Sequence, residues 1–217
     1  MKRTVAAAAA AVAVLIGTAA CGDDGAVDPD TTAAPPAAED VVTGEVSPTD
    51  VWFAQMMIPH HDQAIEMSDM LLAKDGIDDR VLALAEDIKA AQTPEVEQLS
   101  EWLSAWGEDV PPTGMPMQPG NGMRMPGHEM AADDMHAGPG GMGMMSAEDM
   151  QALADAEGDD AARLFLEHMI VHHEGAVMMA QREVDEGTHP GATEMANTII
   201  ETQQQEITEM RQLLDEL

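Results

Sequence analysis

The sequence is poor in cysteine, in aromatic residues and in positive charge, and each shortage excludes a class of protein. Cys21 is the only cysteine among the 217 residues, so no internal disulfide and no cysteine cluster for a metal can form. Aromatic residues make up 2 % of the chain and tyrosine is absent, which argues against a β-sandwich and against a site that stacks sugars or nucleobases. Nine basic residues face 41 acidic ones, and this net charge of -32 argues against nucleic-acid binding, because phosphate contacts need a basic surface.

The first 46 residues are predicted to form a signal peptide followed by a flexible tether. Residues 1–20 combine a short basic start with a small, apolar run, which is typical of a secretory signal peptide. The following Cys21 resembles the lipidated cysteine of a bacterial lipoprotein, so we expect an extracytoplasmic protein anchored to the cell membrane, with secretion as the alternative. Residues 21–46 have no apolar period and predict a flexible tether.

Two stretches of the sequence resemble each other and indicate a duplicated unit. Residues 53–67 align with residues 165–179, beginning in each case at a phenylalanine and ending at a methionine. The likeness continues into the next apolar segment, where Glu95 aligns with Glu206. An internal repeat of this kind indicates that one structural unit occurs twice.

The spacing of apolar residues predicts an all-α fold. Long helices are expected over residues 47–74, 80–106, 161–186 and 191–217, with a short helix over 147–156. Two helical hairpins joined by a long Met/Gly/Pro-rich connection predict a four-helix bundle over residues 47–217. Pro59 lies within the first helix, so that helix is expected either to kink there or to begin there.

Histidine and methionine recur at helical spacing in both copies and predict a soft-metal site. Residues at i, i+4 and i+7 share one face of a helix, which places imidazole and thioether groups one turn apart. Thioethers favour Cu(I), and imidazole binds several transition metals. The inner candidates are His60, His168, His172, Met56, Met67 and Met179. The outer candidates are His61, His173, Met57 and Met169. The alternative for each methionine stripe is ordinary core packing.

Half of the 20 methionines lie between residues 115 and 150, in a segment rich in glycine and proline. We expect residues 107–145 to form a loop, because this composition suits neither a helix nor a strand. One interpretation is an arm that offers thioethers to Cu(I) or Ag(I), and the other is a low-complexity linker. The candidate ligands in the arm are Met115, Met117, Met123, Met125, His128, His136, Met142, Met144 and Met145.

The sequence resembles the bacterial domain-of-unknown-function family 305. The resemblance rests on Met-Met-Ile-Pro-His-His at 56–61, on Met-Gly-Met-Met-Ser at 142–146 and on the motif over 164–180, and it extends over residues 50–217. It implies a ferritin-like four-helix bundle with an extracytoplasmic role, which in some members is copper binding and resistance. The motif residues His60, His61, His172 and His173 carry over by position, together with the methionines around them.

Three functions follow from these patterns. The first is a membrane-tethered protein that captures Cu(I) and passes it to a copper-accepting protein, without catalysis. The second is a di-iron or haemerythrin-like protein, although no motif histidine has the glutamate three residues earlier that di-iron bundles use. The third is a structural lipoprotein that binds another protein. The sequence has neither a His-Glu-x-x-His nor a Gly-x-Ser-x-Gly motif, so a hydrolase is not expected.

Overall fold

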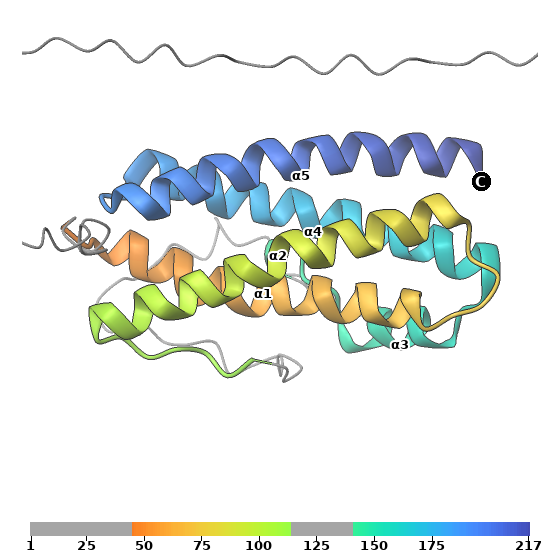
Figure 1. The fold of residues 1–217 in the computed structure, drawn as a ribbon, viewed down its shortest axis with the longest axis horizontal. Coiled ribbons are helices and arrows are strands. Elements are labelled where there is room, and N and C mark those ends of the chain that lie inside the picture. Colours follow the sequence, from red (N-terminus) through yellow and green to blue (C-terminus); the bar gives the residue numbers. More distant parts are fainter. Residues whose placement is uncertain (1–44, 114–140) are drawn as a thin grey trace, which may run out of the picture. The chain divides into compact units, whose positions relative to one another are not determined.

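The computed structural model of the protein describes residues 45–113 and 141–217, and within these ranges every regular element is helical. The long helices are α1 (Pro48–Leu72), α2 (Asp79–Trp106), α4 (Gly158–Glu186) and α5 (Pro190–Glu216) (Figure 1). The 3-10 turn η1 (Gly141–Gly143) and the short helix α3 (Ala147–Asp155) precede α4. The predicted all-α class is therefore confirmed, and all described residues belong to one compact unit, Ala38–Leu217.

Local signals in the sequence explain where the helices begin. Ser47 caps α1 in a capping box with Asp50, and Ser146 caps α3 in the same way with Asp149. The start of α4 at Gly158 precedes the expected start at residue 161, because two aspartates suit the first turn of a helix. Since α1 begins at Pro48 and continues through Pro59, the expectation of a helix start at Pro59 is wrong.

The long helices form two antiparallel hairpins, α1 with α2 and α4 with α5 (Figure 1). The hairpins meet mainly through α1 and α4, while α2 and α5 contact each other much less. Asp50, in the first turn of α1, accepts hydrogen bonds from the backbone N–H groups of Thr188 and His189, just after the end of α4. α1 and α4 are therefore antiparallel, and the two copies of the repeat face each other in the centre of the bundle.

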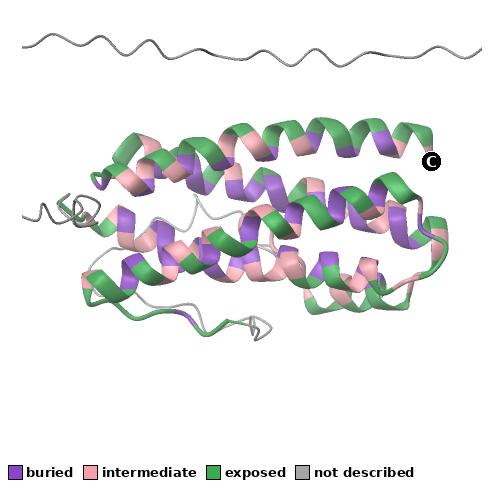
Figure 2. Ribbon diagram, viewed as in Figure 1, coloured by how far each residue is buried: buried purple, intermediate pink, exposed green. Residues whose placement is uncertain are grey.

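The core consists of two apolar clusters. Figure 2 shows the buried residues as stripes along the inner faces of the helices. The Phe53 cluster contains Phe53, Met57 and Met179 with residues of all four long helices. The Phe165 cluster contains Phe165, Met67 and Met169, again with residues of all four long helices. Because α1 and α4 are antiparallel, each cluster takes its phenylalanine from one copy of the repeat and a buried methionine from each copy.

Several predicted features lie outside the described residues. They are the signal peptide (1–20), Cys21, most of the tether (21–46) and residues 114–140 of the Met-rich segment. Among the helices of residues 45–113 and 141–217, none is long and apolar enough to cross a membrane.

Candidate metal centre

Four histidines form a row through the middle of the bundle. The rings of His60 on α1 and His172 on α4 are in contact, with centroids 3.7 Å apart and planes inclined by 35°. His61 lies beside His60 at 6.3 Å between centroids, and His173 lies beside His172 at 6.4 Å. Each of the four residues is at most 1 % exposed. The histidine row thus crosses the two central helices at the level that separates the Phe53 cluster from the Phe165 cluster.

A glutamate from an outer helix terminates the row at each end. The His61 Nε2 atom lies 2.8 Å from a carboxylate oxygen of Glu95 on α2. The His173 Nε2 atom lies 2.7 Å from a carboxylate oxygen of Glu206 on α5. The arrangement is nearly symmetric because Glu95 and Glu206 occupy matching positions in the repeat. Glutamates on α2 and α5 therefore complete a row that draws on all four long helices.

The two inner histidines are neutral. Burial, followed by the nearby His61 ring, lowers the pKa of His60 to about 3, against a raising effect of the hydrogen bond to the Met142 carbonyl. Burial also lowers the pKa of His172 well below its ordinary value, with the neighbouring His60 ring as the next cause. A neutral imidazole keeps one nitrogen lone pair, which is the form that binds a metal ion.

All four rings of the row contain a buried nitrogen atom without a hydrogen-bond partner. These atoms are Nδ1 of His60, His61, His172 and His173, and also Nε2 of His172. The amide groups of Gln92 and Gln203, which are 2 % and 3 % exposed, likewise contain buried atoms without a partner. Buried polar atoms in folded proteins are almost always satisfied, so this concentration of exceptions indicates a missing ligand.

The structure distributes the predicted methionine ligands over both core clusters. Met57 and Met179 belong to the Phe53 cluster, and the half-buried Met56 and Met142 pack against it. Met67 and Met169 belong to the Phe165 cluster, against which Met145 packs. Thus Met67 and Met179, which were expected to share one site, lie on opposite sides of the histidine row. Each side of the row nevertheless receives thioethers from both α1 and α4.

The remaining candidate ligands are half-buried or lie outside the described residues. His168 is half-buried on α4, and its Nδ1 atom is buried without a partner. Met144 is half-buried in the segment between η1 and α3. The other arm candidates, residues 115–136, lie outside the described residues.

Residues 141–145, called the strap here, cover the inner histidines. The Met142 carbonyl accepts a hydrogen bond from His60 Nε2 at 3.0 Å. Gln63 on α1 makes two hydrogen bonds to the backbone of Met145, of 3.0 and 2.7 Å. On α4, Gly175 leaves the space that Met142 occupies, since a Cβ atom there would lie 1.8 Å from the Met142 carbonyl oxygen. Met142 itself has a left-handed backbone (φ 61°), a conformation that costs free energy in a non-glycine residue.

A buried carboxyl pair lies at the end of the bundle where α1 begins. Asp50 accepts hydrogen bonds from Ser47, Thr188 and His189, and Glu183 on α4 hydrogen bonds to it. Burial, together with the hydrogen bond to Asp50, raises the pKa of Glu183 to about 8. Although burial alone would raise the pKa of Asp50, its hydrogen bonds from Glu183 and the backbone hold it well below its usual range. Glu183 therefore carries the proton of the pair.

Sequence reasoning did not assign a role to Glu95 or Glu206, and of the strap it considered only the methionine side chains, as candidate ligands. The signal for the glutamates was present, because a carboxylate recurs at the same position of both copies. Across residues 45–113 and 141–217, no three His, Cys, Asp or Glu side chains converge as a metal site would require. Any site with three or more protein ligands in this part of the chain must therefore include sulfur, a backbone carbonyl or an amide.

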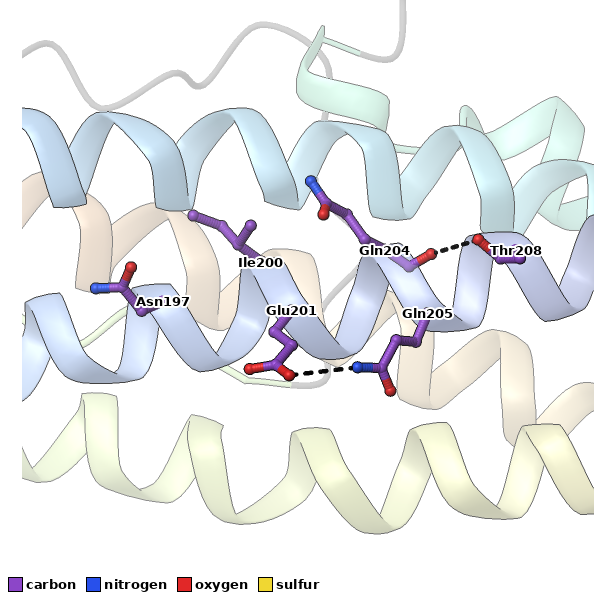
Figure 3. A pocket seen from close by; sticks show the side chains of 6 residues that line it. All are labelled: Asn197, Ile200, Glu201, Gln204, Gln205 and Thr208. Atoms are coloured by element: carbon purple, nitrogen blue, oxygen red, sulfur yellow. Dashed lines mark hydrogen bonds between the residues drawn. The ribbon is translucent and has the colours of Figure 1, made fainter.

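A surface hollow on α5 is distinct from the histidine row. Figure 3 shows its lining side chains along the helix, with Gln205 reaching toward Glu201. The lining residues are Asn197, Ile200, Glu201, Gln204, Gln205 and Thr208. Their amide, hydroxyl and carboxylate groups do not favour a soft metal ion.

Comparison with known families gives one match that spans most of the chain. Residues 50–214 match the model of the family described as Domain of unknown function (DUF305). No curated protein matches the chain.

Solved structures of similar proteins share the fold. A DUF305 fragment from Deinococcus radiodurans is 31 % identical, with a TM-score of 0.62, over 79 % of this chain and 99 % of that one. A putative secreted DUF305 protein from Streptomyces coelicolor is 30 % identical, with a TM-score of 0.61, over 77 % and 91 % of the two chains. CopM in its Cu(II)-bound form is 29 % identical, with a TM-score of 0.59, over 77 % and 96 %. CopM structures with Cu(I) and with silver are also similar to this chain.

Proposed function

The chain belongs to the DUF305 family, and from this premise we propose that it binds copper as Cu(I) outside the cytoplasm, through histidine and methionine ligands. The observation that supports the proposal most directly is the set of buried, unpartnered imidazole nitrogens in the histidine row. A row of bulky polar rings in an apolar core is costly unless a ligand or partner satisfies it. The copper- and silver-bound forms of the similar protein CopM agree with this reading.

The chemistry of the available donors favours a soft, monovalent ion. The inner imidazoles are neutral, and thioether side chains lie in the clusters on both sides of the row. Thioethers bind Cu(I) and Ag(I) better than they bind Zn(II) or Fe(II). A di-iron site would need several converging carboxylates and histidines, and residues 45–113 and 141–217 contain no group of three such side chains.

The ligands that we propose are His60, His61, His172 and His173, together with Met57, Met67, Met169 and Met179. The Met-rich arm over 107–145 would deliver ions to this centre, with Met142 and Met145 of the strap at its inner end. The predicted signal peptide and a lipid on Cys21 would hold the bundle at the outer face of the cell membrane. A copper-accepting protein would receive the ion there.

We predict that replacing both inner histidines weakens Cu(I) binding. Cu(I) would be titrated anaerobically against a competing chelator into residues 38–217 and into a His60→Ala/His172→Ala variant. The affinity is expected to fall at least about tenfold in the variant, a loss of about 1.4 kcal/mol or more of binding free energy, because two nitrogen donors are removed. The matched control is His189→Asn, which changes a buried histidine outside the row and keeps a side chain that can cap α5.

The outcomes separate the competing interpretations. Unchanged Cu(I) affinity in a folded double variant would exclude the inner histidines and move the site to the outer histidines or to the Met-rich arm. Preference for Fe(II) over Cu(I) would favour the carboxylate alternative. No binding of Cu(I), Zn(II) or Fe(II) would contradict the proposal and leave a structural bundle whose partner is a protein.

A further inference from the structure

The two outer histidines are held in the same way in both halves of the bundle. His61 and His173 are fully buried, and each directs Nε2 at a glutamate of the neighbouring helix. The glutamate side chains are 19 % and 13 % exposed, so their outer edges still reach water. This placement lets each carboxylate remain hydrated on one side while it hydrogen bonds a buried ring on the other.

These contacts determine which ring nitrogen carries the proton. A carboxylate oxygen only accepts, so His61 and His173 must each donate from Nε2. The Nδ1 atoms of both rings are buried and have no hydrogen-bond partner. A proton there would leave a buried donor unsatisfied, which is costly. Each outer ring therefore presents the free lone pair of Nδ1 to the interior.

We propose that Glu95 and Glu206 are positioning residues that fix His61 and His173 as Nδ1 ligands for a soft monovalent cation, one in each half of the bundle. The proposal rests on the proposed copper-binding function and adds to it the ligand atoms and their supporting residues. A carboxylate that accepts from the distal nitrogen of a ligating imidazole fixes the ring orientation and strengthens its donor nitrogen. It also supplies negative charge close to the bound cation.

The positions of the rings favour separate half-sites. The ring centroids of His60 and His61 are 6.3 Å apart, those of His60 and His172 are 3.7 Å apart, and those of His172 and His173 are 6.4 Å apart. His61 and His173 thus lie at opposite ends of the row, on either side of the contacting inner pair. Within each copy, a buried methionine lies one helical turn before the outer histidine, Met57 before His61 and Met169 before His173. Each half therefore has its own buried thioether side chain one helical turn from its outer histidine, on the same face of the helix.

The test is ¹⁵N nuclear magnetic resonance of the histidine rings in residues 38–217, titrated with Ag(I), which is diamagnetic. Without metal, His61 and His173 are expected to carry a proton at Nε2 and none at Nδ1. Ag(I) is expected to shift the Nδ1 resonances of both rings and to saturate at two ions per chain. In Glu95→Leu, Ag(I) affinity at the His61 half is expected to fall about tenfold or more, while the His173 half is unchanged. Glu206→Leu should give the mirror result.

Two control variants keep the proposal testable. Glu95→Gln retains an oxygen that accepts from Nε2, so it should preserve the tautomer and rescue much of the affinity that Glu95→Leu loses. Glu97→Leu changes an exposed carboxylate on the same helix and should have no effect. If a leucine variant does not fold, the tautomers of the unmodified chain and the glutamine variant still decide the question.

The results distinguish the positioning role from the function on which it rests. Protonation at Nδ1, an Ag(I) shift at Nε2, or unchanged affinity in both leucine variants would overturn the positioning role and leave copper binding intact. An Ag(I) titration that moves no histidine resonance and binds no ion would overturn both. Saturation at one ion shared by both halves would overturn the assignment of separate half-sites.

Discussion

The Glu183→Gln variant is expected to keep its stability as the pH rises, whereas the unmodified protein loses about 4 kcal/mol between about pH 4.5 and about pH 8. The pKa of Glu183 rises from its ordinary value of 4.5 to about 8 in the folded protein, through burial and the hydrogen bond to Asp50. A carboxyl group with a raised pKa in the folded state contributes stability that is fully present below the unfolded pKa. That contribution is lost as the pH rises through the folded pKa, so the loss falls between about 4.5 and 8.

Glutamine should remove this dependence because it has no proton to lose and its amide can still donate to Asp50. The measurement is the free energy of unfolding by denaturant at several pH values, supported by thermal melting. A difference of about 4 kcal/mol corresponds to about 10 °C in Tm for a chain of this size. Glu194→Gln, which changes an exposed carboxylate on α5, is the control and should follow the unmodified protein. Parallel pH profiles for Glu183→Gln and the unmodified protein would show that Glu183 is ionised in the fold.

Replacing Gly175 by alanine is expected to lower the free energy of unfolding by about 2 kcal/mol, whereas alanine in place of glycine normally stabilises a helix. The added Cβ would lie 1.8 Å from the carbonyl oxygen and 2.4 Å from the carbonyl carbon of Met142. These are backbone atoms, so no side-chain rotation relieves the clash and the strap must move. Its displacement also breaks the hydrogen bond between His60 Nε2 and the Met142 carbonyl.

The matched comparison uses Met178, which is 62 % exposed on the same helix. There, alanine should be more stable than glycine by about 1 kcal/mol from helix propensity alone. The alanine-minus-glycine difference is therefore expected to have opposite signs at positions 175 and 178 in chemical unfolding. The same sign at both positions would mean that the strap does not pack against α4 as described.

Much of the local structure could be predicted from the sequence. The apolar period identified the helices of both hairpins, because it depends on residues within one or two turns of each other, and the repeat identified the hairpins as two copies of one unit. The family and the all-α class followed from the same motifs and are confirmed. The pairs of histidine and methionine one turn apart were also visible, since i and i+4 positions share a face in any α-helix.

The candidate centre depended on contacts between helices, which local spacing does not specify. The helical period placed His60, Met67 and Met179 on similar stripes, yet the antiparallel packing of α1 against α4 assigns Met67 and Met179 to different clusters. Packing of α2 and α5 against the central pair brought Glu95 and Glu206 to the outer histidines. The strap reaches His60 only because Gly175, far away in sequence, leaves room for it.

The sequence by itself thus determined the helices, their buried faces and the supply of soft donors, because each of these follows from the order of neighbouring residues. Tertiary structure alone decided that His60 meets His172, that a glutamate terminates each end of the row, and that Glu183 is buried beside Asp50 and keeps its proton. The physical reason is that helical periodicity sets which way a side chain points, whereas the docking of antiparallel hairpins sets what it meets there.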